Sequence, residues 1–244
     1  MDSEWQARQA EMEDWYATFA ADEARAAQLL DYEYRPHAAA LAAFRGDVLD
    51  IGGGAGLAAG FLRADVRYVV LDPSPSWNEA PWPDIRRRLS PAAVEPDFVS
   101  GVGEALPFGD CSFDGALSFW SFNHAQDPER CVAEMHRVLR PGGVALVVLE
   151  DVEPTWRDVA RLALEELRYR VTGRGASRLH WHQPGLETSV ETARRKLSAS
   201  GWPLQADHVR ITDADWHRWI KGRFVVRDRR WVDGFLTFDL ERPA

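Results

Sequence analysis

The stretch DVLDIGGGAG at residues 47–56 decides the fold of this chain. Its first half is apolar and is typical of a buried strand, and its second half is a glycine-rich turn. Residues 57–62 follow with apolar side chains at helical spacing, which completes a nucleotide-binding βα unit. Glycines at positions 52, 54 and 56 remove side chains where the backbone turns sharply and approaches a ligand. A plain strand-to-helix turn stays open as the alternative, because one such turn is a weak signal.

Two carboxylates near this turn favour a ligand-binding role. Asp50 stands two residues before the first glycine, and Asp72 ends the next apolar run, at residues 68–71. An acid at the end of that second strand can accept both hydroxyls of a ribose. Asp50 would repel a pyrophosphate and attract a ligand that carries an ammonium and a sulfonium. Residues 54–59 also fit the dinucleotide pattern, so NAD(P) remains an alternative that Asp50 disfavours.

Composition limits the classes of protein to consider. The 244 residues suffice for one well-buried core, and 45% hydrophobic with 27% charged residues is ordinary for a globular protein. A net charge of −9 disfavours general binding to nucleic acid. No apolar run is long enough for a membrane span, and residues 1–5 do not resemble a secretory signal. With Cys111 and Cys131 as the only cysteines, we expect a cytoplasmic protein without a cysteine zinc site.

Apolar runs alternate with amphipathic segments from residue 47 to residue 150, which predicts an α/β fold with a parallel sheet covered on both faces. We expect strands at 48–51, 68–71, 97–101, 115–119 and 144–149, and a helix at 128–139 that Asp127 caps. The proline-rich loop 72–83 holds Trp77 and Trp82, which either plug the surface or line a substrate mouth.

The flanks are less informative. Residues 3–30 and 36–44 are predicted to be helical, and their aromatic side chains either pack on the core or form a lid. In the lid interpretation, Trp15 or Tyr16 faces a cationic ligand. Downstream we expect a helix at 154–171 and strands at 205–211 and 234–240.

Four motifs in order resemble those of the class I S-adenosylmethionine-dependent methyltransferases, in particular the group that acts on small molecules. They are the turn at 48–56, the acid at Asp72, the pair of segments 106–108 and 113–114, and the segment 137–143. The resemblance covers residues 47–150 and neither flank. It implies a doubly wound, seven-stranded, mostly parallel Rossmann-like sheet whose last strand is antiparallel, and residues 234–240 are the candidate for that strand. It also implies a single domain, with a helical lid at 1–45, a cofactor-binding core at 46–150 and substrate-side elements at 151–244.

The resemblance implies a binding mode for S-adenosyl-L-methionine. The methionine part would lie on the glycine turn near Asp50, the ribose on Asp72, and the adenine against the loop at 103–105. The residues so assigned are Asp50, Gly52, Gly53, Gly54, Gly56, Asp72, Pro73, Gly103, Glu104 and Ala105, with Ser118 and Phe119 as the floor and Tyr16 from the lid. Val102 departs from the pattern, because many relatives place an acid there that bonds the adenine amino group. Either backbone and apolar contacts hold the adenine, or Glu104 takes over.

The predicted activity is methyl transfer to a small-molecule acceptor, with no metal, no nucleic acid and no membrane involved. Three alternatives remain: a non-methylating user of the cofactor such as a cyclase, a cofactor-binding protein with a decayed site, and an NAD(P) oxidoreductase. The candidate catalytic residue is His124, which follows the fourth predicted strand and titrates near neutral pH as a general base requires. A purely structural or a binding role for His124 stays open, and His180, His182 and Glu150 are the reserve candidates.

Overall fold

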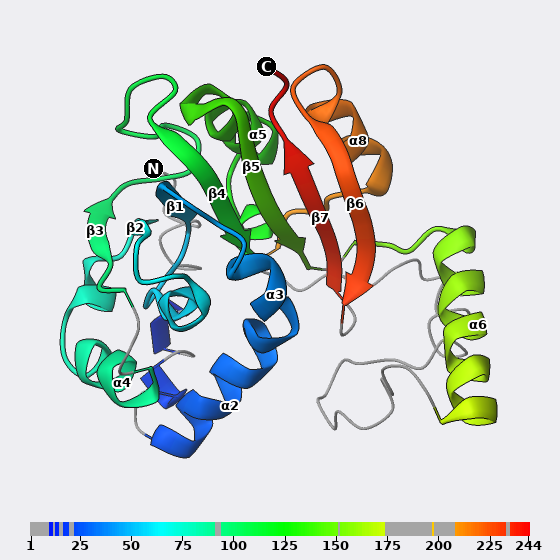
Figure 1. Ribbon diagram of the computed structural model, residues 1–244, viewed down its shortest axis with the longest axis horizontal. Coiled ribbons are helices and arrows are strands. Elements are labelled where there is room, and N and C mark those ends of the chain that lie inside the picture. The colour runs from blue at the N-terminus through cyan, green and yellow to red at the C-terminus, as the bar shows by residue number, and fades with distance from the viewer. Residues whose placement is uncertain are drawn as a thin grey trace.

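A seven-stranded sheet forms the centre of the molecule (Figure 1). The computed structural model describes residues 10–11, 13–14, 17–19, 22–90, 94–150, 152–173, 197, 208–232 and 235–244. The strand order is β3-β2-β1-β4-β5-β7-β6. The strands are β1 Asp47–Ile51, β2 Arg67–Asp72, β3 Asp97–Ser100, β4 Phe113–Phe119, β5 Leu139–Leu149, β6 Val225–Val232 and β7 Phe235–Glu241. Strands β1 to β5 pair in parallel and β7 is antiparallel to both neighbours, which confirms the predicted fold class.

The strand order reverses between β1 and β4. The chain moves outward from β1 to β2 and β3, and then returns to the other side of β1 for β4 and β5. In open sheets of this kind, ligands bind at such a reversal, outside the carboxyl ends of the strands. The glycine turn after β1 and the loop after β4 both lie at this edge.

Helices cover both faces of the sheet, as predicted. One face packs on α2 Glu23–Glu33, α3 Ala38–Leu41, α4 Trp82–Leu89 and the 3-10 helix η2 Leu57–Phe61. The other face packs on α5 Pro128–Val138 and α8 Asp213–Ile220. The remaining helices are η1 Arg35–His37, η3 Pro75–Asn78, η4 Phe122–His124 and α6 Trp156–Thr172.

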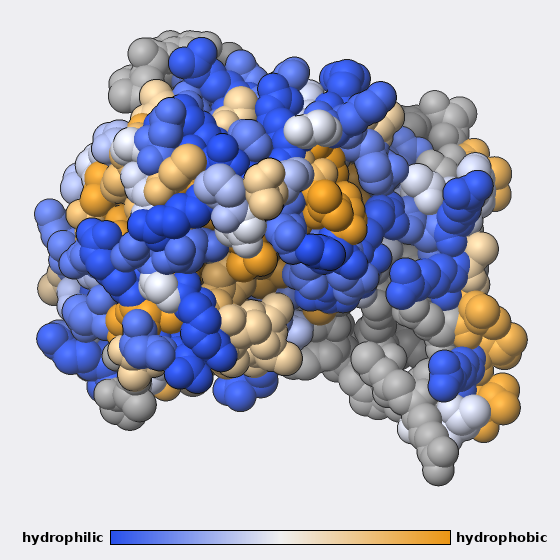
Figure 2. All heavy atoms as spheres, turned by 45° about the horizontal axis from the view of Figure 1, so that its top comes forward, coloured by the Kyte–Doolittle hydropathy of each residue, from blue (hydrophilic) through white to orange (hydrophobic). Residues whose placement is uncertain are grey.

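Helix α6 lies beyond the β6 edge of the sheet, and its apolar side chains Trp156, Leu164, Leu167 and Val171 are exposed (Figures 1 and 2). Among the described helices, none combines the length and the apolar character that crossing a bilayer demands.

Three local expectations were wrong. The segment after the glycine turn is a five-residue 3-10 helix, and Gly60 within it allows Ser90 Oγ to approach within 2.3 Å of where a Cβ would stand. Strand β5 begins at Leu139 and includes Pro141 to Gly143, because Gly142 and Gly143 exchange backbone hydrogen bonds with Arg242. The described part of the predicted strand 205–211 is not a strand; the sixth strand is β6, whose run of charged residues hides the apolar alternation.

Candidate functional site

The glycine turn is held against the loop that follows β4. Gly52, Gly54 and Gly56 all have positive φ, and a Cβ on Gly52 would lie 2.4 Å from the Cβ of Ser121. The Ser121 hydroxyl donates to the carbonyl of Ile51 at 2.7 Å. Only glycine fits at position 52, because both the backbone conformation and the contact with Ser121 exclude a side chain.

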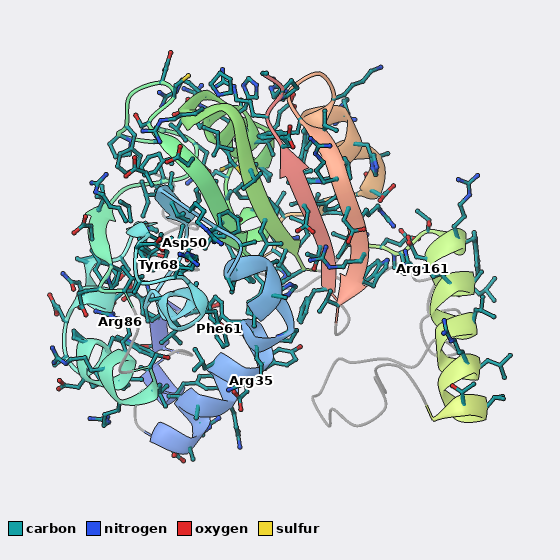
Figure 3. All side chains as sticks on the ribbon, viewed as in Figure 1. Arg35, Asp50, Phe61, Tyr68, Arg86 and Arg161 are labelled. Carbon is teal, nitrogen blue, oxygen red and sulfur yellow. The ribbon has the colours of Figure 1, made fainter. Side chains whose placement is uncertain are left out.

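Asp50 is buried beneath this turn. The Tyr68 hydroxyl donates to Asp50 Oδ2 at 2.5 Å, and the two residues lie close together on neighbouring strands (Figure 3). Asp50 Oδ1 is buried without a hydrogen-bond partner among the described residues. Burial raises the pKa of Asp50 to about 7, although the hydrogen bond from Tyr68 opposes the rise. This carboxyl is therefore poised to ionise when a positive charge approaches.

Asp72 anchors the segment that follows β2. Its Oδ2 accepts the backbone N–H of Gly54 at 3.1 Å, and its Oδ1 accepts the backbone N–H of Ser74 and the indole N–H of Trp77, each at 3.0 Å. Burial raises the pKa of Asp72 to about 6, although these hydrogen bonds oppose the rise.

Trp77 and Trp82 are both buried with their rings 5.3 Å apart, so neither is an exposed loop tryptophan. Pro73 lies between Asp72 and Ser74.

The loop at 101–105 lies beside the start of α5. A Cβ on Gly103 would meet the Sγ of Cys131 at 2.9 Å. The Glu104 carboxylate accepts the backbone N–H of Gln126 at 2.7 Å and that of Asp127 at 3.2 Å. Glu104 thus fixes the chain before α5, and Ala105 follows it in a turn.

Two further predicted residues lie on the end of β4. The hydroxyls of Ser118 and Ser121 are 2.7 Å apart, and Phe119 is buried with its ring 5.0 Å from that of Tyr34. Among the predicted site residues, Tyr16 falls outside the described part of the chain, as do His180 and His182.

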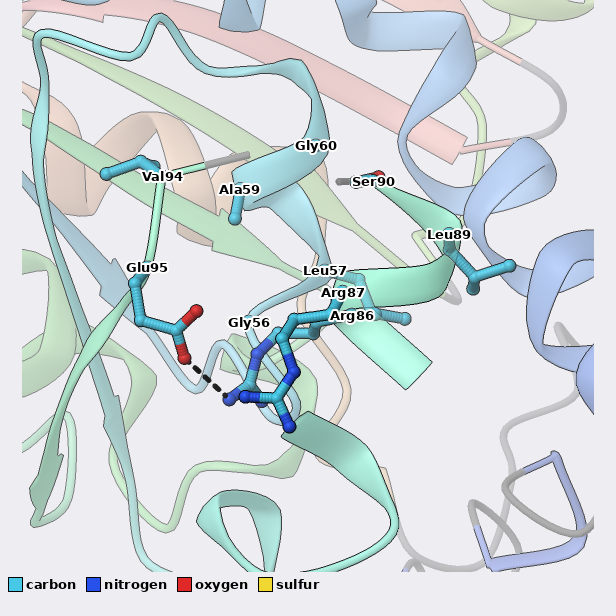
Figure 4. Close-up of a pocket in the computed structure, with 10 residues that line it drawn as sticks. All are labelled: Gly56, Leu57, Ala59, Gly60, Arg86, Arg87, Leu89, Ser90, Val94 and Glu95. Atoms are coloured by element: carbon cyan, nitrogen blue, oxygen red, sulfur yellow. Dashed lines mark ion pairs between the residues drawn. The ribbon is translucent and has the colours of Figure 1, made fainter. Parts of the chain in front are cut away.

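A cavity of about 220 Å³ lies between η2 and α4 (Figure 4). Arg86 lines it and is 4% exposed; its Nη1 donates to the carbonyl of Ala55 at 2.8 Å and more weakly to that of Trp77 at 3.4 Å. Glu95 faces the guanidinium at 3.6 Å. Arg86 therefore ties the glycine turn to the Trp77 segment from the α4 side.

His124 lies in η4, just beyond β4, and two other residues join it there. Glu150 directly follows β5, and His208 precedes α8. Glu150 Oε2 is 3.0 Å from His208 Nε2 and 3.9 Å from His124 Nε2. The two imidazole rings are perpendicular with centroids 4.4 Å apart. The structure thus brings together the main catalytic candidate, one of its reserves, and a histidine that the sequence analysis missed.

Asn123 holds this cluster in place. Its side-chain amide donates to the carbonyl of Glu150 at 2.9 Å and accepts the N–H of Glu150 at 3.0 Å. Its own carbonyl accepts the N–H of Val209 at 2.6 Å. The side chain and the backbone of Asn123 therefore tie the loop of His124 to Glu150 and to Val209, which follows His208.

Comparison with known proteins agrees with this geometry. The family model described as a methyltransferase domain matches residues 49–147. A methyltransferase from Mycobacterium avium is 38% identical over 146 residues, which are 59% of this chain and 54% of that protein. A second, from Mycolicibacterium gilvum, is 41% identical over 101 residues, 41% of this chain and 37% of that protein. Residues 49–147 therefore resemble a methyltransferase domain, and the seven-stranded sheet agrees with the fold of the class I S-adenosylmethionine-dependent methyltransferases.

Solved structures share the methyltransferase fold at low identity. A Burkholderia thailandensis 1,6-didemethyltoxoflavin-N1-methyltransferase, with its substrate and S-adenosylhomocysteine bound, has a TM-score of 0.55 at 18% identity and covers 98% of this chain and 90% of its own. A [4+2]-cyclase has a TM-score of 0.55 at 14% identity and covers 90% of this chain and 80% of its own. The chain spans about half the length of the Mycobacterium avium relative, so the match describes a domain rather than the whole of that protein.

Several residues of this site were not predicted. Tyr68 carried a detectable signal, because a tyrosine in an otherwise aliphatic run needs a partner for its hydroxyl. Asn123 precedes the candidate histidine, but nothing in the sequence indicates its hydrogen bonds to Glu150. Nothing in the sequence around His208 indicates that it meets His124 and Glu150.

Proposed function

We propose that the chain transfers the methyl group of S-adenosylmethionine to a small-molecule acceptor. The observation that carries the proposal is the acid–glycine–acid edge. Asp50 lies beneath the glycine turn, and Asp72 accepts the Gly54 amide on the turn itself. An ammonium and a sulfonium would be attracted to this edge, whereas a pyrophosphate would meet two carboxylates.

S-adenosylmethionine is the cofactor in this proposal, and Asp72 holds its ribose. A carboxylate offers about four lone-pair sites, and three N–H groups already use part of that capacity. Ribose hydroxyls would take the remaining site and replace the indole N–H of Trp77. Trp77 would then lie next to the sugar, where its apolar ring excludes water.

The adenine would be held by backbone and apolar contacts of the loop at 102–105. Glu104 Oε1 accepts the N–H groups of Gln126 and Asp127, which favours backbone and apolar contacts over Glu104 as the holder of the adenine. We therefore expect poor discrimination against analogues altered at the adenine amino group.

The acceptor would lie beyond the ends of β4 and β5, next to His124. Methyl transfer needs the acceptor atom, the methyl carbon and the sulfur in line, and a hydroxyl acceptor must also lose its proton. A general base is the role predicted for His124 from its position alone. The presence of Glu150 and His208 beside His124 favours removal of that proton without His124 as the base. The predicted lid stays a prediction, because Trp15 and Tyr16 lie outside the described residues.

The test is incubation with S-adenosylmethionine and a panel of hydroxyl and amine acceptors, followed by mass spectrometry. The proposal expects S-adenosylhomocysteine together with an acceptor heavier by one CH₂ unit. A product isomeric with its substrate would mark a non-methylating enzyme instead. Tight cofactor binding without turnover on any acceptor would favour a decayed site.

A further inference from the structure

We propose that His124, Glu150 and His208 form a binding site for a divalent first-row transition-metal ion. The three residues offer two imidazoles and one carboxylate, and their ligand atoms all lie within 4.8 Å of one another. The catalytic role of this ion rests on the proposed methyl transfer, whereas the binding of the ion does not.

The donor set selects the class of ion. Two histidines and one carboxylate suit Zn²⁺, Fe²⁺, Mn²⁺ or Co²⁺, whereas Mg²⁺ and Ca²⁺ prefer oxygen ligands alone. The described part of the chain supplies three ligands to this site, which is the number of protein ligands typical of catalytic rather than structural metal sites.

The geometry is close to what such an ion requires. Ligand atoms about 2.0–2.2 Å from one ion are themselves about 3–3.5 Å apart. The distance of 3.0 Å between Glu150 Oε2 and His208 Nε2 already meets this, and His124 Nε2 at 3.9 Å from the same oxygen needs only a small movement. The perpendicular rings allow both nitrogens to point at one centre.

Burial and support also fit a metal site. The His208 side chain is 2% exposed, while those of Glu150 and His124 are 19% and 16% exposed, so all three side chains are largely withdrawn from water. The Asn123 clamp fixes the backbone of Glu150 and of Val209, next to His208. A surface ion pair would not need a buried amide of this kind, whereas the ligands of a metal ion gain affinity when their positions are fixed in advance.

An ion at this place would act on the acceptor. An acceptor hydroxyl bound to it has a lowered pKa and releases its proton to solvent. The oxygen then forms a bond to the methyl carbon while the carbon–sulfur bond breaks and its electron pair stays on sulfur. A histidine whose lone pair binds the ion cannot also accept the proton, so His124 is a ligand rather than the general base. The substrate class is a small molecule with a hydroxyl beside a second oxygen, which together fill two open positions.

The experiment is titration of the apo-protein with Co²⁺, followed by visible absorption, with calorimetric binding of S-adenosylhomocysteine measured on the same samples. The test variants are His124→Gln, Glu150→Gln and His208→Gln. The control is His217→Gln, which removes an exposed histidine paired with Asp213. His124→Gln is the most informative test variant, because His124 is less buried than His208 and its replacement disturbs the fold least.

The proposal expects one equivalent of Co²⁺ in the wild-type protein and in the His217→Gln control, and affinity at least about 10-fold weaker in each test variant. Wild-type binding retained in His124→Gln and Glu150→Gln would overturn it, as would an equal loss of binding in His217→Gln. Absence of Co²⁺ binding with normal S-adenosylhomocysteine binding would refute the metal site and leave the proposed function intact. The reverse result would refute the proposed function and leave the metal site intact.

Discussion

The two ends of the site differ in how the chain builds them. Most of the cofactor edge comes from one stretch, residues 50–77, in which Asp72 binds the backbone of Gly54 and Ser74 and the side chain of Trp77. The acceptor edge comes from three distant segments that meet only in the folded sheet, at His124, Glu150 and His208. The cofactor edge depends on local backbone geometry, and the acceptor edge depends on the tertiary fold and on the Asn123 clamp.

The largest expected effect is a loss of turnover that leaves cofactor affinity unchanged, which distinguishes the acceptor edge from the cofactor edge. His124→Gln should lower turnover by about 10²–10⁴-fold while the affinity for S-adenosylhomocysteine stays within about 2-fold, since the group acts only on the acceptor. The rate is measured as S-adenosylhomocysteine released with the best acceptor of the panel. His217→Gln is the control. Equal losses of turnover and of cofactor affinity would mean that the two edges are not separate.

Gly52→Ala should damage the cofactor edge through packing. The new Cβ would lie 2.4 Å from the Cβ of Ser121 at a φ of +69°, so we expect the free energy of unfolding to fall by about 2–4 kcal/mol, together with cofactor affinity. Gly142→Ala is the matched control, because Gly142 has a φ of +79° but nothing within 4 Å of the new Cβ. Chemical denaturation measures the free energy of unfolding of both variants. Equal destabilisation in the two variants would show that the contact with Ser121 contributes nothing.

Asp72→Ala should weaken cofactor binding by about 1–3 kcal/mol, the cost of leaving polar partners unmet. Asp97→Ala is the control, since Asp97 is an exposed acid at the opposite, amino end of its strand. Isothermal titration with S-adenosylhomocysteine measures the difference. If both variants bind as the wild-type protein does, Asp72 has no part in holding the ribose.

A further effect on the cofactor edge concerns pH. The folded-state pKa of Asp50 is raised from 3.8 to about 7, so between these values the folded protein keeps a proton that the unfolded chain has lost. Stability therefore falls as pH rises from about 4 to about 7, by at most about 1.4 kcal/mol per pH unit from this group. Asp50→Asn should flatten that slope in denaturation series at about pH 5, 6 and 7. The same slope in both proteins would show that Asp50 ionises normally.

Sequence reasoning reached the fold and the cofactor edge because their determinants are local. The glycine turn and Asp72 are fixed by strand periodicity and by backbone conformations that only glycine adopts readily. The acceptor edge was reached only at His124 and, as a reserve, Glu150. His208 lies far from both in sequence, and only the packing of the segment before α8 against η4 reveals it. Strand β6 was missed for a related reason, since an edge strand rich in arginine and aspartate shows little apolar alternation.

The most direct test of the account is a pair of calorimetric titrations of the wild-type protein, one with S-adenosylhomocysteine and one with NADH. The account predicts that S-adenosylhomocysteine binds at one site per chain and that NADH does not bind, because the pyrophosphate of NADH would approach Asp50 and Asp72. Binding of NADH in preference to S-adenosylhomocysteine would contradict the assignment of the glycine turn to a sulfonium cofactor.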